Sequence, residues 1–398
     1  MSRELTIPAD GIPEVCDTPE TISAVAAALA DGVGPVAVDT ERAAGFRYDD
    51  RAFLIQLRRR GAGTFLIAPE GHRAETTAAL APVLSDLDWI LHAAPSDLPC
   101  LADLGLYPAT LFDTQLAGRM AGIERTNLAA MLETIFDVSL AKGHGAEDWS
   151  TTPLPREWKA YAALDVEMLI ELAEVMAELL DGQGKLDWAE QEFAYLAASA
   201  SPSPEPTWRD LKGIGTLKTP EQLQVAKHLW TVRDRDARSL DISPTSILPH
   251  RVLVEIARQL PESRAEMARL RGVPRRDAGD WYREMTRARR TDQSTWPQRL
   301  ERGEGAPSKI AWQQGHPESW ALYQKIRAGL DTVADQAGVP TEVALKPSTL
   351  RDVVWEATEG GAIGSPDELR DYLARADVRP WQTTLAVPVI LGVLFELD

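Results

Sequence analysis

The segment Val36-Ala-Val-Asp-Thr-Glu41 is a short apolar run that ends in two acidic residues. Alternate side chains of a β-strand share a face, so Asp39 and Glu41 are expected on the same side of a sheet. Two carboxylates at the end of a buried strand outline a site for a cation. A D-x-E triplet is common, however, and taken alone this one favours a capped turn with a solvated glutamate.

A second acidic motif, Tyr161-Ala-Ala-Leu-Asp165, lies in a stretch whose apolar residues recur every three or four positions. This periodicity predicts one long helix from Glu157 to Leu180. Residues four apart stack on one helix face, which places the Tyr161 phenol beside the Asp165 carboxylate. An exposed pair on a helix surface is the alternative for this motif alone.

A further acidic residue, Asp97, follows the apolar run Trp89-Ile-Leu-His92 and stands near a predicted helix start. Acidic side chains are favoured at helix N-termini, so capping is the better explanation of Asp97 by itself. Taken together the motifs form a constellation of four acids and a phenol, which is improbable by chance. The constellation comprises Asp39, Glu41, Asp97, Tyr161 and Asp165.

The surrounding sequence predicts an α/β domain with a mixed sheet. Short apolar runs bounded by Gly, Pro or Asp predict strands, and amphipathic stretches predict helices. The order of helix, three strands, helix, strand and then mostly helices differs from a repeating βαβ series. The expected strands cover residues 35–39, 52–57, 64–68 and 89–92, and the expected helices cover residues 19–30 and 73–84.

Chain length and loop composition indicate three domains. The 398 residues are too many for one typical domain. The Pro- and Ser-rich stretch from Ser199 to Pro206 cannot continue a helix, and a weaker break is expected between Ala288 and Pro307. We therefore expect domains at residues 1–200, 207–285 and 305–398, the last two being small and all-helical.

The charge is distributed unevenly among these parts. Residues 1–200 hold 14 basic and 32 acidic side chains, which accounts for the whole formal net charge of −18. Residues 201–303 hold 20 basic and 14 acidic side chains, and residues 304–398 hold 8 and 14. An acidic domain can still bind a polyanion if its carboxylates converge on divalent cations, because the ions then dominate the local potential.

Further motifs accompany the acids along the first domain, over about residues 20–185. They are Phe46-Arg-Tyr48, Leu54-Ile-Gln-Leu57, Phe112-Asp-Thr-Gln115, Asp148-Trp-Ser150, Pro153-Leu-Pro155 and Tyr161-Ala-Ala-Leu-Asp-Val166. With these motifs the chain resembles the DEDDy group of 3′-to-5′ exonucleases and, within it, the ribonuclease D family. One departure is Thr152, where the family pattern has an arginine.

This resemblance implies an RNase H-like domain that hydrolyses RNA from its 3′ end with two divalent ions, Mg²⁺ or Mn²⁺. It implies that Asp39, Glu41 and Asp165 hold the ion that activates water. Asp39 is then expected to bridge to a second ion, which Asp97 supports largely through water, and Tyr161 to position the attacking water. The chemistry agrees, because hard cations prefer oxygen ligands and two ions stabilise both reacting oxygens.

The second domain resembles an HRDC domain, a small helical bundle that often binds nucleic acid. The resemblance rests on Val232-Arg-Asp-Arg-Asp-Ala237, Ile247-Leu-Pro249 and Leu253-Val-Glu-Ile-Ala257. Its arginines, among them Arg269 and Arg271, either contact phosphates or form an ordinary solvated helix face. The acidic third domain looks like a divergent HRDC-like domain, and its tryptophans favour core packing over base stacking.

We expect the substrate to be the 3′ ends of structured RNA such as tRNA precursors. The same carboxylates would cleave DNA, and an inactive scaffold that binds nucleic acid is an alternative against which the intact acids argue. Two cysteines and no long apolar run predict a cytoplasmic protein without a membrane partner. The sequence leaves the oligomeric state open.

Three other polar residues are expected outside the chemistry. His92 lies on an apolar run and is expected in the core or at its rim, and His144 is expected in a loop. Asp113 in Phe112-Asp-Thr-Gln115 is expected to cap a helix rather than to bind a cation.

Overall fold

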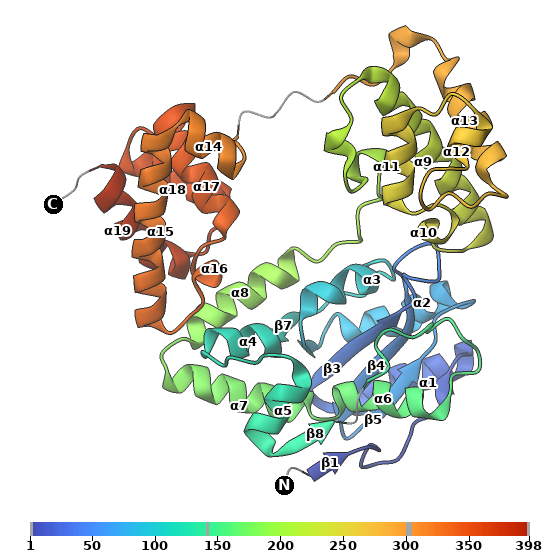
Figure 1. The fold of residues 1–398 in the computed structure, drawn as a ribbon. Coiled ribbons are helices and arrows are strands. Elements are labelled where there is room, and N and C mark those ends of the chain that lie inside the picture. The colour runs from blue at the N-terminus through green and yellow to red at the C-terminus, as the bar shows by residue number, and fades with distance from the viewer. Residues whose placement is uncertain (1–2, 141–142, 300–304, 396–398) are drawn as a thin grey trace.

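The computed structural model describes residues 3–140, 143–299 and 305–395. Figure 1 shows a sheet region in blue to green, a middle helical region in yellow and a C-terminal helical region in orange to red. The sheet region runs from β1 to α8, the middle helical region from α9 to α13, and the C-terminal helical region from α14 to α19. The fold is therefore a mixed α/β body followed by two helical bodies, as predicted.

A six-stranded mixed sheet forms the centre of the first region, in the order β2-β5-β4-β3-β6-β7. The central strand β3 runs antiparallel to β4 and parallel to β6. A separate two-stranded sheet pairs β1 with β8. The strands are β1 (Arg3–Leu5), β2 (Val15–Cys16), β3 (Val33–Arg42), β4 (Ala52–Arg60), β5 (Gly63–Ile67), β6 (Asp88–Leu91), β7 (Thr110–Asp113) and β8 (Val138–Leu140).

Helices cover both faces of this sheet. The even-numbered side chains of β3, such as Val36 and Val38, pack against α1, α2 and α3. On the opposite face, Ala37 joins a second core with α7, and α6 packs over β3, β4 and β5. The helices are α1 (Pro19–Asp31), α2 (Arg73–Leu84), α3 (Leu98–Ala102), α4 (Thr114–Met120), α5 (Leu128–Phe136), α6 (Arg156–Glu167), α7 (Leu169–Gly182) and α8 (Leu186–Ala198).

The prediction of one helix from Glu157 to Leu180 is wrong. The backbone leaves the helical conformation at Met168, with φ −119° and ψ 12°, and α6 and α7 are separate helices. They pack on different partners, α6 on the strands β3 to β5 and α7 on β3, β6 and α4. The apolar periodicity continues through the break because Val166 and Leu169 are both fully buried.

The middle helical region has a core of its own, built from residues between Leu211 and Ala288. It contacts the loop that joins β3 to β4 mainly through polar groups. Arg51 in this loop is paired with Asp241 at 2.9 Å, and the Tyr48 hydroxyl donates to Asp234 at 2.9 Å. Its helices are α9 (Pro220–Leu240), α10 (Pro244–Ile247), α11 (His250–Gln259), α12 (Arg264–Met267) and α13 (Ala278–Arg289).

The C-terminal helical region shares a core with the sheet region. Trp381 is 2% exposed and stacks on Trp188 of α8 with ring centroids 5.1 Å apart. Glu192 of α8 accepts two hydrogen bonds from Arg379 and one from the Trp381 indole. Its helices are α14 (Lys309–Gly315), α15 (Pro317–Ala337), α16 (Thr341–Ala344), α17 (Pro347–Trp355), α18 (Pro366–Arg375) and α19 (Pro380–Leu394).

The tryptophans of this last region serve packing, as expected. Trp312 is fully buried at the centre of a core that is formed within residues 312–391. Trp320 and Trp355 lie against it at ring distances of 5.5 and 5.9 Å. Within the described part of the chain, no helix has both the length and the apolar character required to span a membrane.

Substitution of Glu192 by Ala tests the contact between α8 and the C-terminal helical region. The change leaves the Arg379 guanidinium and the Trp381 N–H buried without their acceptor, so we expect a loss of about 3–5 kcal/mol in unfolding free energy. Chemical denaturation followed by tryptophan fluorescence measures it. The exposed Glu190 on the same helix is the matched control, whose replacement by Ala should change stability by less than about 0.5 kcal/mol.

Candidate metal centre

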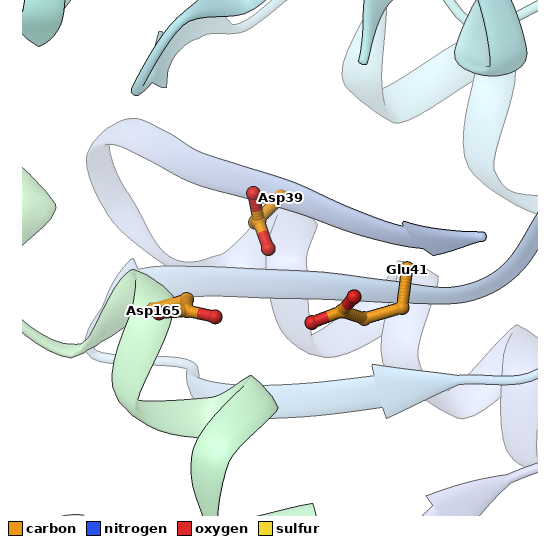
Figure 2. A group of neighbouring side chains, drawn as sticks. All are labelled: Asp39, Glu41 and Asp165. Atoms are coloured by element: carbon orange, nitrogen blue, oxygen red, sulfur yellow. The ribbon is translucent and has the colours of Figure 1, made fainter. Parts of the chain in front are cut away.

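Three of the predicted acids come together at the end of β3. Asp39 and Glu41 project from β3, and Asp165 projects toward them from α6 (Figure 2). One carboxylate oxygen from each residue lies within 4.8 Å of the others. The sequence patterns on a strand and on a helix therefore meet at one point.

The local packing explains how α6 can approach the strand so closely. The alanines Ala162 and Ala163 of α6 are fully buried against Leu54 of β4 and Leu66 of β5. Side chains this small let the helix axis lie near the sheet. Asp165 is thereby held above the same face of β3 that carries Asp39 and Glu41.

Asp97 is close to this cluster but lies outside the group of three. Its side chain is 3% exposed and accepts a hydrogen bond of 2.6 Å from the Thr40 hydroxyl. Thr40 points to the opposite face of β3 from Asp39 because neighbouring strand residues alternate. The capping that Asp97 would favour if taken alone is absent, since its side chain makes no capping hydrogen bond at the start of α3.

Burial raises the pKa of all four acids, and neighbouring negative charges add to this effect. Burial is the larger cause and raises the pKa of Glu41 to about 9, with the charges of Asp165 and Asp97 adding to it. The pKa of Asp165 rises to about 7 and that of Asp97 to about 6, again mainly through burial. The pKa of Asp39 is raised well above its usual value by burial and by the other three acids. The cation-free site therefore holds protons at neutral pH.

Tyr161 lies beside Asp165, as the helical spacing predicts. Burial raises the pKa of its phenol, and the nearby charges of Asp165, Glu41 and Asp39 raise it further. The hydroxyl therefore stays neutral and can donate a hydrogen bond. A close approach of the chain at Gly143 encloses the ring, because a Cβ there would meet Tyr161 Cε2 at 2.6 Å.

Asp113 and His92 make the structural contacts that were expected, and His144 lies in a loop. The Asp113 side chain caps α4 by accepting from Gln115 N and Leu116 N, and it also accepts from Ala93 N and Ala94 N. His92 is hydrogen-bonded to Thr114, and burial lowers its pKa to about 4. His144 lies outside the group of three acids, in a loop, with its ring 5.9 Å from that of Tyr161.

Arg42 is a site residue that the sequence analysis missed. Its guanidinium donates to the Ser96 carbonyl and lies 3.9 Å from Asp50. Its positive charge lowers the pKa of both Glu41 and Asp97, against the stronger effect of burial. Its position directly after Asp39-Thr-Glu41 was the available signal, because it brings a cation to the rim of the same strand end.

Two cavities open beside the carboxylates. One of about 620 Å³ is lined by residues that include Glu41, Arg42, Phe46 and Glu147. The other, of about 540 Å³, is lined by Tyr161 and Asp165 together with apolar side chains such as Ile7 and the polar residues His144 and Arg156. The cluster is therefore reachable from both sides.

Known protein families match all three regions of the chain. A family described as 3′-5′ exonuclease matches residues 13–181, and the HRDC domain family matches residues 222–288. A family described as 3′ to 5′ exonuclease C-terminal domain matches residues 305–394.

Curated relatives carry the name ribonuclease D. The protein of Acidiphilium cryptum is 30% identical over 274 residues, which cover 67% of this chain and 68% of that protein. The chain belongs to the ribonuclease D family. A second member, from Gluconacetobacter diazotrophicus, is 30% identical over 246 residues, and the match spans 60% of this chain and 62% of that protein's own length. Family membership and the exonuclease domain identify the chain as a 3′-5′ exoribonuclease.

Solved structures agree with the fold over nearly the whole chain. A protein from Bifidobacterium adolescentis is 31% identical with a TM-score of 0.85, covering 99% of this chain and 100% of that one. Escherichia coli RNase D is 21% identical with a TM-score of 0.67, covering 91% of this chain and 99% of that one. The second likeness supports the arrangement of a mixed α/β body and two helical bodies.

The residues present fit a divalent cation of the Mg²⁺ type. The converging donors are carboxylate oxygens, the ligands that hard cations prefer. Burial and neighbouring negative charges raise the pKa of Glu41 and Asp165, which means that their ionised forms are destabilised. A positive charge between the carboxylates would stabilise those ionised forms. A divalent ion would supply this charge in place of the protons.

We predict that stability without metal falls as pH rises from about 4 to about 9. Acids with a raised pKa keep their protons in the folded state while the unfolded chain releases them, so the folded state binds more protons in this range. Added Mg²⁺ should raise the melting temperature more at pH 9 than at pH 5. Thermal melts in chelator and in Mg²⁺ measure both effects.

Asp165→Asn serves as the control for this pH dependence. It removes one titrating group and part of the repulsion, so its metal-free stability should fall less steeply with pH than that of the unaltered chain. Identical slopes for the two proteins would contradict the assignment of the dependence to this cluster.

Proposed function

We propose that this exoribonuclease trims the 3′ ends of structured RNA, tRNA precursors among them, by hydrolysis that depends on two divalent ions bound at Asp39, Glu41, Asp97 and Asp165. The observation that carries the proposal is the convergence of three carboxylate oxygens within 4.8 Å. Mg²⁺ and Mn²⁺ both suit such ligands, and we propose that either ion serves.

We assign the roles of the individual residues from the resemblance to the family, and the positions of the side chains support this assignment. Bound ions supply an activated water and neutralise charge on the attacking and leaving oxygens of the phosphodiester. Asp39 and Glu41 on β3 and Asp165 on α6 would hold one ion, and Asp39 would also contact the second. Asp97, which is buried and hydrogen-bonded to Thr40, would support that second ion.

Tyr161 orients the water. Its phenol stays neutral because burial raises its pKa, so it acts as a hydrogen-bond partner rather than as a strong base. The substrate reaches the cluster through the cavities beside Glu41 and Tyr161.

We propose that the three regions act as an exonuclease domain at residues 1–200, an HRDC domain at 207–285 and a helical domain at 305–398. Arg269, Arg271 and Arg275 of the HRDC domain are exposed, and no ion pair within the described ranges involves them. Unpaired guanidinium groups are suited to RNA phosphates. Cys16 and Cys100 are free, which favours action in the reducing cytoplasm.

The decisive experiment compares RNA and DNA strands of one sequence, labelled at either end, in Mg²⁺, Mn²⁺ and chelator. We expect mononucleotides from the 3′ end of RNA in both metals and no product in chelator. Asp39→Ala and Asp165→Ala should abolish hydrolysis and leave melting temperatures equal or higher, because repulsion among the acids is relieved. Preferred cleavage of DNA would contradict the proposed substrate, and activity retained in both variants would contradict the metal site.

Tyr161→Phe removes the hydroxyl and keeps the ring packed. We predict that the single-turnover rate falls by roughly 10²–10⁴, the range for groups that position or transfer a proton, while RNA affinity changes little. Rapid-quench kinetics and filter binding measure the two quantities. Weaker binding with an unchanged chemical rate would make Tyr161 a substrate contact instead.

Combined replacement of Arg269, Arg271 and Arg275 by Ala should weaken RNA binding and flatten its dependence on salt. Counterion release gives a slope of about −0.7 per phosphate contacted on a single strand, so each lost contact reduces the slope by about that amount. Affinity is measured from 50 to 300 mM salt in Ca²⁺. Replacement of Arg276, which is paired with Asp277, provides the control.

A further inference from the structure

Gln56 on β4 is a buried glutamine whose carboxamide has no partner. Its side chain is fully buried, and neither Nε2 nor Oε1 makes a hydrogen bond within the part of the protein that the structure describes. Buried polar groups in native proteins are nearly always paired, because an unpaired one loses its water without compensation. An exception calls for an explanation in function.

The sheet places this amide directly across from the metal centre. The register of β3 and β4 pairs Asp39 with Gln56, and the next pair on the same face is Glu41 with Leu54. Opposite residues of antiparallel strands have Cβ atoms about 4.5–5.5 Å apart. On its other side, Gln56 faces Leu66 of β5. Of its two cross-strand neighbours, therefore, only Asp39 has a polar side chain.

Next to Gln56 on the same face of β4, Arg58 is paired with Glu167 of α6 at 3.4 Å, and neither of them bonds to the glutamine. Leu54 and Leu66 lie under Ala162 and Ala163 of α6 in one apolar cluster. Adjacent strands thus place a buried amide without a partner directly opposite an acid of the proposed metal centre.

We infer that Gln56 is a positioning residue, whose amide N–H donates to the Asp39 carboxylate when a cation binds and thereby fixes the side-chain conformation in which Asp39 holds it. Carboxylates that ligate a metal are usually hydrogen-bonded by a neighbouring group, which fixes their orientation. This inference rests on the proposed metal site and assigns a function to the polar residue within the apolar motif Leu54-Ile-Gln-Leu57.

Gln56→Met tests the inference, since methionine has a similar volume and no donor. Calorimetric titration of the full chain with Mn²⁺, without RNA, should show an affinity at least about tenfold lower than that of the unaltered chain, the usual cost of losing a group that orients a metal ligand. The melting temperature in chelator should stay equal or rise, because an unpaired buried amide has been removed. At saturating Mn²⁺, kcat should fall with KM for RNA unchanged.

Gln382→Met is the matched control. Gln382 is also buried, but its amide is paired, donating to the Val343 carbonyl at 2.6 Å and accepting from Arg379 N at 3.0 Å. Its replacement should lower the melting temperature and leave Mn²⁺ affinity unchanged. The two variants should therefore differ in both measurements: Gln56→Met should lower Mn²⁺ affinity without lowering the melting temperature, and Gln382→Met should do the reverse.

The outcomes separate this inference from the proposed function. If the unaltered chain binds Mn²⁺ and Gln56→Met binds it equally well, Gln56 has no positioning role and the metal site stands. If the unaltered chain fails to bind Mn²⁺, the metal site itself is wrong.

A crystal structure of the unaltered chain with Mn²⁺ gives an answer even where the variant fails to fold. It should place Gln56 Nε2 within about 2.7–3.2 Å of an Asp39 oxygen. Another partner for that nitrogen would overturn the inference.

Discussion

Carboxylates buried together at the end of β3 repel one another, and the rest of the exonuclease domain must hold them in place against this repulsion. Like charges in a medium of low polarity raise one another's pKa, and water is excluded from screening them. Such a cluster persists only on a rigid support. The β3–β4 ladder and the close contact of α6 through Ala162 and Ala163 provide that support, while Thr40 holds Asp97 on the opposite face.

The two helical domains are attached to this support by different chemistry. The HRDC domain contacts the β3–β4 loop through charged and polar pairs, centred on Asp241 with Arg51 and Asp234 with Tyr48. The C-terminal domain is joined to α8 by the stacked pair Trp188 and Trp381 within a shared apolar core. The HRDC domain thus contacts the β3–β4 loop, which begins directly after the acids of β3. The C-terminal domain contacts α8, the helix that precedes the Pro- and Ser-rich stretch from Ser199 to Pro206.

The sequence predicted most of this arrangement because its strongest signals are local. The strand period at Val36 to Glu41 and the four-residue spacing from Tyr161 to Asp165 each specify a face, and the structure brings those faces together. The break at Met168 could not be predicted, since the apolar face continues across it and only the choice of packing partners ends the helix. The hydrogen bond from Thr40 to Asp97 could not be predicted from the sequence either, because it joins two distant segments. It takes the place of the local capping that Asp97 alone favoured. The edge strand β2 has two residues and is too short for a clear period.

The shared core between α8 and the C-terminal domain bears on how the chain acquires its structure. Apolar side chains from residues 334–344 and Trp381 complete a core that otherwise consists of the exonuclease domain. The exonuclease domain is synthesised first. Until residues 334–344 and Trp381 have also been synthesised, the apolar surface that they cover remains exposed to solvent. The HRDC domain lies between the two and carries its own core, so it can fold during that interval. The exonuclease domain can bury this part of its surface only after the C-terminal domain has been synthesised, whereas the HRDC domain needs no later segment to complete its own core.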